Sequence, residues 1–336
     1  MNDSAHGPWV HRDRPWELPA GQLCPESTWL NRRQMLASLG FFGASSLLPA
    51  CTRAEAPVKL QAPWPAELLA RIPGKHNTRY DPERSITPEA IGSVYNNFYE
   101  LSTNKDAVVR LADSYAHRPW TVEVVGECHK ARTFDIDTLL TQFTQEERHY
   151  RFRCVEAWSA TYPWSGFPLR SLLDAVEPTS HARYVRFVSL QDPKSLPGQR
   201  KQPWYPWPYH EGLTLPEARN ELTFLATGIY GHRLPGQHGA PIRLLTPWKY
   251  GFKSAKAIVR IELMRTRPPT FWNLTVPDEY DFWANVEPAM PHPRWSQSTE
   301  RLLDTGDRIR TRRFNGYGKY VASLYEDPTN MGFLRG

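Results

Sequence analysis

Short stretches between residues 120 and 190 alternate hydrophobic with polar side chains, which is the pattern of half-buried β-strands. The alternating stretches are residues 120–125, 150–155 and 184–190. Two further stretches predict short helices: Asp135 or Asp137 caps the helix that begins in residues 135–140, and a proline opens the helix over residues 168–176. No glycine-rich phosphate loop follows any of these strands. This order of elements predicts an α+β fold and argues against a nucleotide-binding α/β sheet.

Two long stretches lack a regular pattern. Residues 58–94 hold prolines at short intervals, which forbid long helices and predict an extended arm that wraps the domain. Residues 191–220 combine prolines with many aromatic side chains, and we interpret them as a long loop that either covers the core or forms the entrance wall of a site. The sequence shows no clear linker beyond residue 57, so we expect one domain over residues 57–336.

Residues 1–56 have the pattern of an export signal. Arg32 and Arg33 precede an uncharged run of about 15 residues, which is too short for a comfortable membrane span. Twin arginines before a short apolar segment are typical of a Tat-type signal, which exports folded proteins that already carry their cofactors. We therefore expect a periplasmic protein. Its signal ends either by ordinary cleavage near residue 56 or at Cys51, which would then carry a lipid anchor.

The composition excludes several classes of protein. The net charge of +6 would permit nucleic-acid binding, but the chain has no lysine- and arginine-rich run and no known binding module, so we expect no such partner. Four cysteines do not make a disulfide scaffold in an exported chain of 336 residues, and we expect Cys128 to be a buried structural residue. There is no histidine pair at zinc-ligand spacing, no C-x-x-C and no C-x-x-C-H.

Cys154 lies at the end of the strand predicted over residues 150–155. Strand alternation places Phe152 on its side and directs Arg151 and Arg153 to the other side. Aromatic and basic neighbours at a strand end suit a thiolate that binds a soft metal, and they suit a buried inert thiol equally well. The flanking signature of thiol hydrolases is absent. From the residues alone, both the inert and the metal-binding interpretation stay open.

A resemblance decides between these interpretations. The segment of residues 150–173 contains Arg-Phe-Arg-Cys-Val-Glu-Ala-Trp and then Tyr-Pro-Trp-Ser-Gly-Phe-Pro-Leu. It is similar to the molybdenum-binding segment of the MsrP (YedY) family, the catalytic subunits of periplasmic protein-methionine-sulfoxide reductases with the sulfite-oxidase fold. Further matches are residues 95–100, 239–243, 247–253 and 293–297, so the likeness covers about residues 58–336.

The resemblance implies a molybdenum–molybdopterin cofactor whose metal is ligated by Cys154. It implies pterin contacts from Asn96, Tyr99 and Glu100, a stretch that otherwise indicates a turn with an aromatic anchor. Ser189 stands where the family usually has a pterin-contacting threonine, and its hydroxyl can make the same contact.

The same resemblance places the anionic part of the cofactor beside residues 238–256. An anion needs positive charge and backbone donors, and a basic cluster there would supply them, although a solvated basic face gives the same pattern. The cluster consists of Arg243, Lys249, Lys253 and Lys256, with Gly239 and Gly251 allowing close backbone approach. The positions implied to line the cofactor are His238, Arg243, Ser254, Ala255 and Lys256. His238 replaces an asparagine of a relative, and Ser-Ala-Lys replaces a glycine-containing stretch.

The activity implied by the resemblance is oxygen-atom transfer from methionine sulfoxide to the molybdenum held by the dithiolene and Cys154. Two electrons and two protons then regenerate the centre and release water. The family's electron donor is MsrQ, a haem b membrane subunit fed by quinols. The substrates are oxidised envelope proteins, so we expect an open, shallow cleft. Sulfite oxidases of this fold carry a further dimerisation domain for which this chain has no room, so we expect a monomer.

Two alternatives stay open. A sulfite-oxidase-like enzyme would act on a small oxyanion and would need several cationic side chains facing the metal. A non-catalytic molybdopterin-binding envelope protein would keep the fold without turnover.

Overall fold

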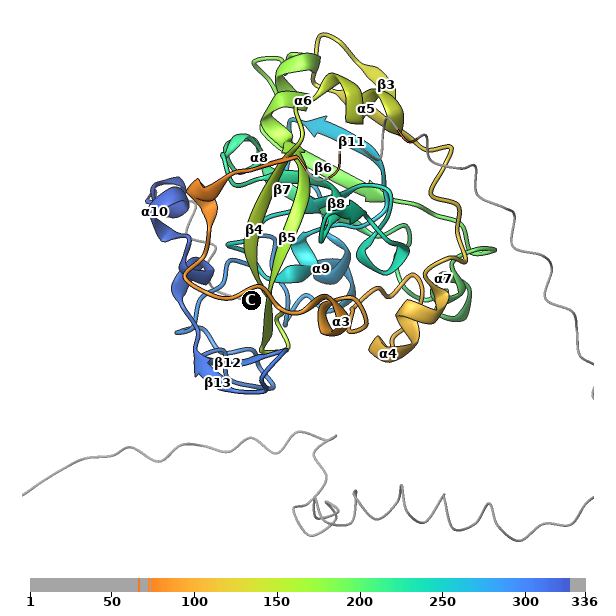
Figure 1. The fold of residues 1–336 in the computed structure, drawn as a ribbon. Coiled ribbons are helices and arrows are strands. Elements are labelled where there is room, and N and C mark those ends of the chain that lie inside the picture. Colours follow the sequence, from red (N-terminus) through yellow and green to blue (C-terminus); the bar gives the residue numbers. More distant parts are fainter. Residues whose placement is uncertain (1–65, 67–71, 73, 327–336) are drawn as a thin grey trace, which may run out of the picture. The chain divides into compact units, whose positions relative to one another are not determined.

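The computed structural model describes residues 66, 72 and 74–326, whose arrangement is drawn in Figure 1. The predicted signal, its cleavage site and Cys51 lie outside these residues. Strands and short helices alternate along the described chain, and the predicted α+β class is confirmed. Within the described residues, no helix combines the length and the apolar character needed to cross a membrane.

One sheet contains two of the three strands that the alternation pattern predicts, β2 (Thr121–Gly126) and β6 (Tyr184–Ser189). Its order is β3 (Arg132–Asp135), β2, β11 (Ile258–Met264), β6 and β7 (His210–Thr214). β2 and β11 run parallel, and the other neighbours are antiparallel. In β6 each buried residue is followed by a half-buried one, so one face of this sheet packs on the core while the other is partly solvated.

The second sheet is organised around a long hairpin, which lies in the middle of Figure 1. β4 (Glu146–Arg153) and β5 (Trp158–Pro168) pair antiparallel, from Glu146 opposite Gly166 to Arg153 opposite Ser159. β5 also pairs with β8 and β12. The remaining strands of the sheet are β1 (Lys75–His76), β8 (Phe224–Ile229), β9 (His232–Arg233), β10 (Arg243–Leu245), β12 (Thr299–Leu302) and β13 (Arg308–Arg310).

The helices of the described chain are short, as its proline content predicts. Asp135 caps α5 through the backbone N–H of Thr138, and Pro168 directly precedes α6. The α-helices are α3 (Glu89–Gly92), α4 (Lys105–Val108), α5 (Ile136–Gln142), α6 (Leu169–Val176), α7 (Pro197–Lys201), α8 (Leu215–Arg219), α9 (Phe271–Thr275) and α10 (Gly318–Val321). The 3₁₀ turns are η3 (Thr78–Tyr80), η4 (Val109–Leu111), η5 (Gly236–His238), η6 (Gly251–Lys253), η7 (Arg313–Gly316) and η8 (Ala322–Tyr325).

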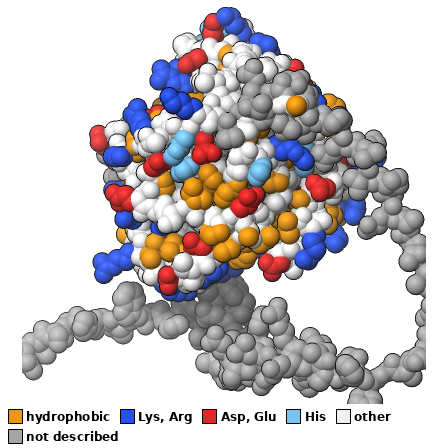
Figure 2. Space-filling view, viewed as in Figure 1, with side chains coloured by type: hydrophobic (Ala, Val, Ile, Leu, Met, Phe, Trp, Pro, Cys, Tyr) orange, Lys and Arg blue, Asp and Glu red, His pale blue; other side chains and the backbone are white. Residues whose placement is uncertain are grey.

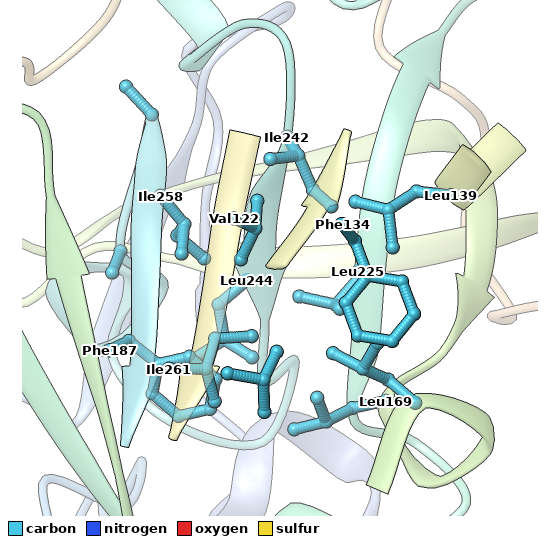
Figure 3. Packing of buried hydrophobic residues seen from close by; sticks show 14 of the residues in the cluster. Val122, Phe134, Leu139, Leu169, Phe187, Leu225, Ile242, Leu244, Ile258 and Ile261 are labelled. Carbon is cyan, nitrogen blue, oxygen red and sulfur yellow. The ribbon is translucent and has the colours of Figure 1, made fainter. Parts of the chain in front are cut away.

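The largest hydrophobic core joins the two sheets (Figure 3). Val122 and Ile261 come from the first sheet, Leu225 and Leu244 from the second, and Leu169 from α6. Each of these side chains has an exposed fraction of 1% or less. Burying one such aliphatic side chain stabilises a fold by roughly 1.5–3 kcal/mol, so this cluster fixes the position of the hairpin against the first sheet.

One expectation from the sequence needs correction. Residues 191–220 are not one irregular loop, because β7 pairs with β6, and α7 and α8 flank it. The strand alternation of β7 is hidden because His210 and Glu211 are both buried.

The strand β5 contains a proline. Pro163 lies opposite His149 within the ladder, and its carbonyl oxygen accepts a hydrogen bond from the backbone N–H of Tyr230 at 3.0 Å.

Candidate active site

Cys154 lies in the tight turn that connects β4 to β5. Its backbone N–H donates to the carbonyl oxygen of Trp158 at 2.9 Å, and Ala157 closes the turn with a positive φ of 62°. Phe152 and Cys154 line the same cavity, while Arg151 and Arg153 are buried on the other side of the strand. The side assignment predicted from alternation therefore holds in the structure.

Hydrogen bonds from residues 293–297 hold this turn in place. Trp295 and Gln297 both donate to the carbonyl oxygen of Val155 at 2.8 Å. Arg153 donates to the carbonyl oxygen of Cys154 and to the side-chain oxygen of Gln297. Residues 293–297, which the sequence singled out without a role, thus position the cysteine.

The thiol of Cys154 has polar neighbours at the edge of a cavity. The side-chain amide of Asn97 and the backbone N–H of Glu156 lie 3.5 and 3.4 Å from Sγ, and a Glu156 carboxylate oxygen lies 3.7 Å away. Although Cys154 is partly exposed toward the cavity, burial and then the negative charge of Glu156 raise its pKa to about 12. At neutral pH the sulfur is therefore a thiol unless a bound cation stabilises the thiolate, which fits a metal ligand and not a free nucleophile.

A pH prediction follows for protein produced in cells that cannot make molybdopterin. The thiolate of Cys154 is the reactive form, so its alkylation by iodoacetamide should rise about tenfold per pH unit up to at least pH 9. Glu156→Gln should speed alkylation at each pH, because removing the negative charge lowers the pKa of the thiol. Peptide mass spectrometry follows Cys154 separately from the other cysteines. A rate that levels off near pH 8 in the wild type would contradict the raised pKa.

Glu156 is a site residue whose role the sequence did not indicate. Its carboxylate accepts from the Asn97 amide at 3.1 Å and the Trp158 indole at 3.3 Å, and it pairs with Lys105 at 3.0 Å. Burial alone would raise its pKa, but the hydrogen bonds from Asn97 and Lys105 outweigh burial and the pKa lies below its usual value. A carboxylate anion therefore stands beside the sulfur. The sequence feature that could have indicated this role is the position of Glu156, two residues after Cys154.

The cavity beside Cys154 has a volume of about 720 Å³, which is in the usual range of cofactor sites. The structure brings most of the candidate residues to its lining: Asn96, Tyr99, Glu100, Cys154, His238, Arg243, Ser254 and Lys256. Ser189 and Ala255 are buried and are not among the described residues of this lining. Both backbone groups of Ala255 bond within the fold, to Lys253 and Leu244. The predicted contacts of Ser189 and Ala255 stay predictions.

Two cations in the cavity lining, Arg243 and Lys256, are fully or partly buried without a negatively charged partner among the described residues. Arg243 donates to the carbonyl oxygens of His238 and Ser254, and Lys256 to those of Asn97 and Gln237, and neither cation has an ion pair within the described residues. Burial lowers the pKa of Arg243 to about 9 and that of Lys256 well below its usual range. An anion bound between them would offset this cost.

Neutral polar atoms of the same cavity also lack partners. The Nε2 atom of His238 and the side-chain oxygen of Asn97 are buried without a hydrogen-bond partner in the described structure. Burial lowers the pKa of His238 well below its usual range, so its ring is neutral. Burial raises the pKa of Glu100 to about 7, so this carboxyl can carry a proton near neutral pH and donate a hydrogen bond. These groups fit a heterocycle with amide-like edges, such as a pterin.

The basic cluster expected from the sequence is only half correct. Lys249 and Lys253 do not line the cavity in the described structure, because each is fully buried in an ion pair, with Glu217 at 2.5 Å and with Glu211 at 2.7 Å. Gly239 does allow close approach: a Cβ there would lie 2.5 Å from Cβ of Lys256. At Gly251 the nearest atom would be 3.7 Å away, so glycine is not needed there for space.

A buried cation pair, unpartnered pterin-compatible groups and a thiol at one cavity define a molybdopterin-binding oxidoreductase. Residues 109–272 match the family model of the oxidoreductase molybdopterin binding domain. The protein-methionine-sulfoxide reductase catalytic subunit MsrP of Burkholderia mallei is 43% identical over 313 residues, which cover 92% of this chain and 93% of that protein. The chain belongs to the MsrP family of protein-methionine-sulfoxide reductase catalytic subunits. The predicted family, enzyme class and molybdopterin cofactor are thereby confirmed.

A solved structure gives a weaker likeness. The sulfane dehydrogenase SoxCD from Paracoccus pantotrophus is 14% identical, with a TM-score of 0.43 over 67% of this chain and 60% of that one. A likeness of this degree supports no argument about fold or activity.

Proposed function

We propose that this protein reduces methionine sulfoxide residues of oxidised envelope proteins by oxygen-atom transfer. Family membership supports the reaction, and the paired charges beside the thiol support the type of substrate. The Glu156 carboxylate lies 3.7 Å from Sγ of Cys154 and is paired with Lys105, so this side of the site offers no free positive charge to a small oxyanion but accepts a neutral sulfoxide. This is the observation that carries the choice of substrate.

Different residues of the cavity would bind different parts of the cofactor. Cys154 would ligate molybdenum, Arg243 and Lys256 would bind the anionic groups, and His238 and Asn97 would meet the polar edges of the pterin. When bound, the molybdenum cofactor supplies two-electron oxygen-atom transfer. The protein fixes Cys154 through the turn described above.

The walls around Cys154 suit a thioether side chain. Tyr95 packs edge-on against Trp158, and Trp272 packs against Tyr99 and Tyr280, with ring centroids 5.1–5.4 Å apart. Aromatic faces bind the soft, polarizable sulfur and methyl groups of methionine well. Arg294, which also lines the cavity, is exposed, so a protein loop can reach this side of the site.

The sulfite-oxidase alternative requires cationic side chains that are free to bind an oxyanion. Lys105 is paired with Glu156, and Arg294 with Glu279 at 2.7 Å, so neither offers a free charge to an oxyanion. Arg301 and Arg308 also line the cavity and have no ion pair within the described residues. A direct comparison of the two substrates is therefore the appropriate test.

The cellular setting is part of the proposal. A Tat-type signal in residues 1–56 would deliver the folded protein to the periplasm, with a lipid anchor at Cys51 as an alternative to cleavage. A haem b membrane subunit similar to MsrQ would then supply electrons from quinols. The basis for the partner is the resemblance, together with the words "catalytic subunit" in the name of the relative.

The test compares substrates on protein purified from the envelope with its molybdenum content measured. Reduced viologen should be oxidised in the presence of an oxidised, methionine-rich protein, and a dye acceptor should not be reduced in the presence of sulfite. The reverse result would favour the sulfite-oxidase alternative. About one molybdenum per chain without turnover of either substrate would leave a cofactor-binding protein and overturn the proposal.

A further inference from the structure

A cluster of two histidines and an aspartate lies where the N-terminal strand joins the central hairpin. β1 pairs parallel with β4, which places His76 opposite Glu147 and close to His149. Nε2 of His76 lies 2.7 Å from Oδ1 of Asp81, and Nδ1 of His149 lies 3.5 Å from the same oxygen. The three ligand atoms lie within 4.8 Å of one another, and none of these residues lines the cavity at Cys154.

Glu147 fixes which nitrogen of His149 carries a proton. Its carboxylate lies 3.0 Å from Nε2 of His149, so in the neutral ring Nε2 is the donor and Nδ1 bears a lone pair. That lone pair then faces the carboxylate oxygen of Asp81, and two acceptors so close repel each other unless a cation lies between them. A carboxylate behind a histidine is also the usual outer partner of a metal-bound imidazole.

The side chains have the freedom that metal binding needs. The rings of His76 and His149 stack with centroids 4.0 Å apart, and the exposed fractions are 36% for the side chains of His76 and Asp81 and 17% for that of His149. Around Zn²⁺, tetrahedral ligand atoms lie about 3.3–3.5 Å apart, so the rings need only turn away from each other at the surface. On the face drawn in Figure 2, histidine side chains lie directly beside carboxylates.

We propose that His76, Asp81 and His149 form a surface site for a divalent transition metal of the Zn²⁺ type. Two imidazoles and one carboxylate supply three ligands, and water completes a tetrahedron. The metal would fasten β1 to β4, the strand that ends at Arg153, directly before Cys154. The site is independent of the molybdenum cofactor and of the proposed reaction.

The binding experiment uses the full, molybdenum-loaded protein and Zn²⁺ at pH 7.5, in competition with a chromophoric chelator. His149→Gln should weaken binding at this site at least tenfold, and Glu147→Gln, which keeps all three ligands, should weaken it by about 10–100-fold. His181→Gln is the matched control, because among the described residues His181 has one carboxylate neighbour, Glu127 at 3.9 Å. The wild type and the three variants all contain His6 and His11, so these residues do not affect the differences in zinc affinity between them.

The second readout is thermal unfolding with and without Zn²⁺. Binding to the folded state alone raises the apparent melting temperature of the wild type and of His181→Gln, whereas His149→Gln should show little rise. Equal zinc binding in the wild type and in both cluster variants would overturn the proposal. So would no binding by the wild type at about 1 mM Zn²⁺, a concentration at which a micromolar site is saturated.

Discussion

Replacement of Cys154 by serine is expected to lower methionine-sulfoxide turnover by at least about 100-fold. Loss of a residue that only hydrogen-bonds to a metal ligand typically costs about 10–100-fold, and loss of the ligand itself should cost more. The substitution changes one atom and keeps the turn, because the backbone bonds of Cys154 are unaffected. A serine hydroxyl is a hard ligand that stays protonated, and it is a poor replacement for a thiolate on molybdenum. The measurements are molybdenum per chain and viologen-driven turnover.

Cys128→Ser is the matched control for this prediction. Cys128 is the other described cysteine; it is partly buried, with a raised pKa caused by burial, and it forms an isolated bridge with Pro178 away from the cavity lining. Its replacement should leave molybdenum content and turnover nearly unchanged. Wild-type turnover in Cys154→Ser would refute the role of this thiol, and equal damage in both variants would indicate a general effect on folding.

Local patterns predicted the scaffold of the site well. Alternation in residues 150–155 identified the end of β4, which stops at Arg153 directly before Cys154, and the side on which Cys154 faces the cavity, and Asp135 was a correct helix cap. These features depend on neighbours within a few residues. The hidden strand β7 escaped prediction because both of its faces are covered, so His210 and Glu211 are buried in succession.

Partnerships across the chain could not be predicted in the same way. Lys249 lies near Arg243 in sequence, yet it bonds to Glu217, 32 residues away, and only Arg243 and Lys256 of the expected basic cluster line the cavity in the described structure. Glu156 and Lys105 are 51 residues apart and meet only when α4 folds beside the hairpin turn. Charge pairing across such distances depends on the tertiary fold, so the resemblance supplied candidate cofactor positions, most of which line one cavity, but not the carboxylate beside the thiol.

Loss of the carboxylate of Glu300 should lower the free energy of unfolding by about 3–5 kcal/mol, the usual cost of removing one partner from a buried ion pair. Glu300 pairs with Arg153 at 3.2 Å and with Arg84 at 2.8 Å, and the side-chain exposed fractions of Arg153 and Glu300 are 0% and 1%. In Glu300→Gln, Arg153 keeps its bonds to Gln297 and Cys154 but carries a buried charge without a carboxylate. Urea unfolding at equal molybdenum content measures the change.

An exposed pair provides the comparison for Glu300→Gln. Arg260 and Glu123 lie 3.1 Å apart, and both side chains have an exposed fraction of 45%, so Glu123→Gln should cost less than about 1 kcal/mol. Because Arg153 also bonds the carbonyl oxygen of Cys154, Glu300→Gln should reduce turnover as well, through a looser turn. If both variants unfold at the same urea concentration, the Arg153–Glu300 pair does not stabilise the cysteine turn, and the bonds from Trp295 and Gln297 to Val155 must hold it instead.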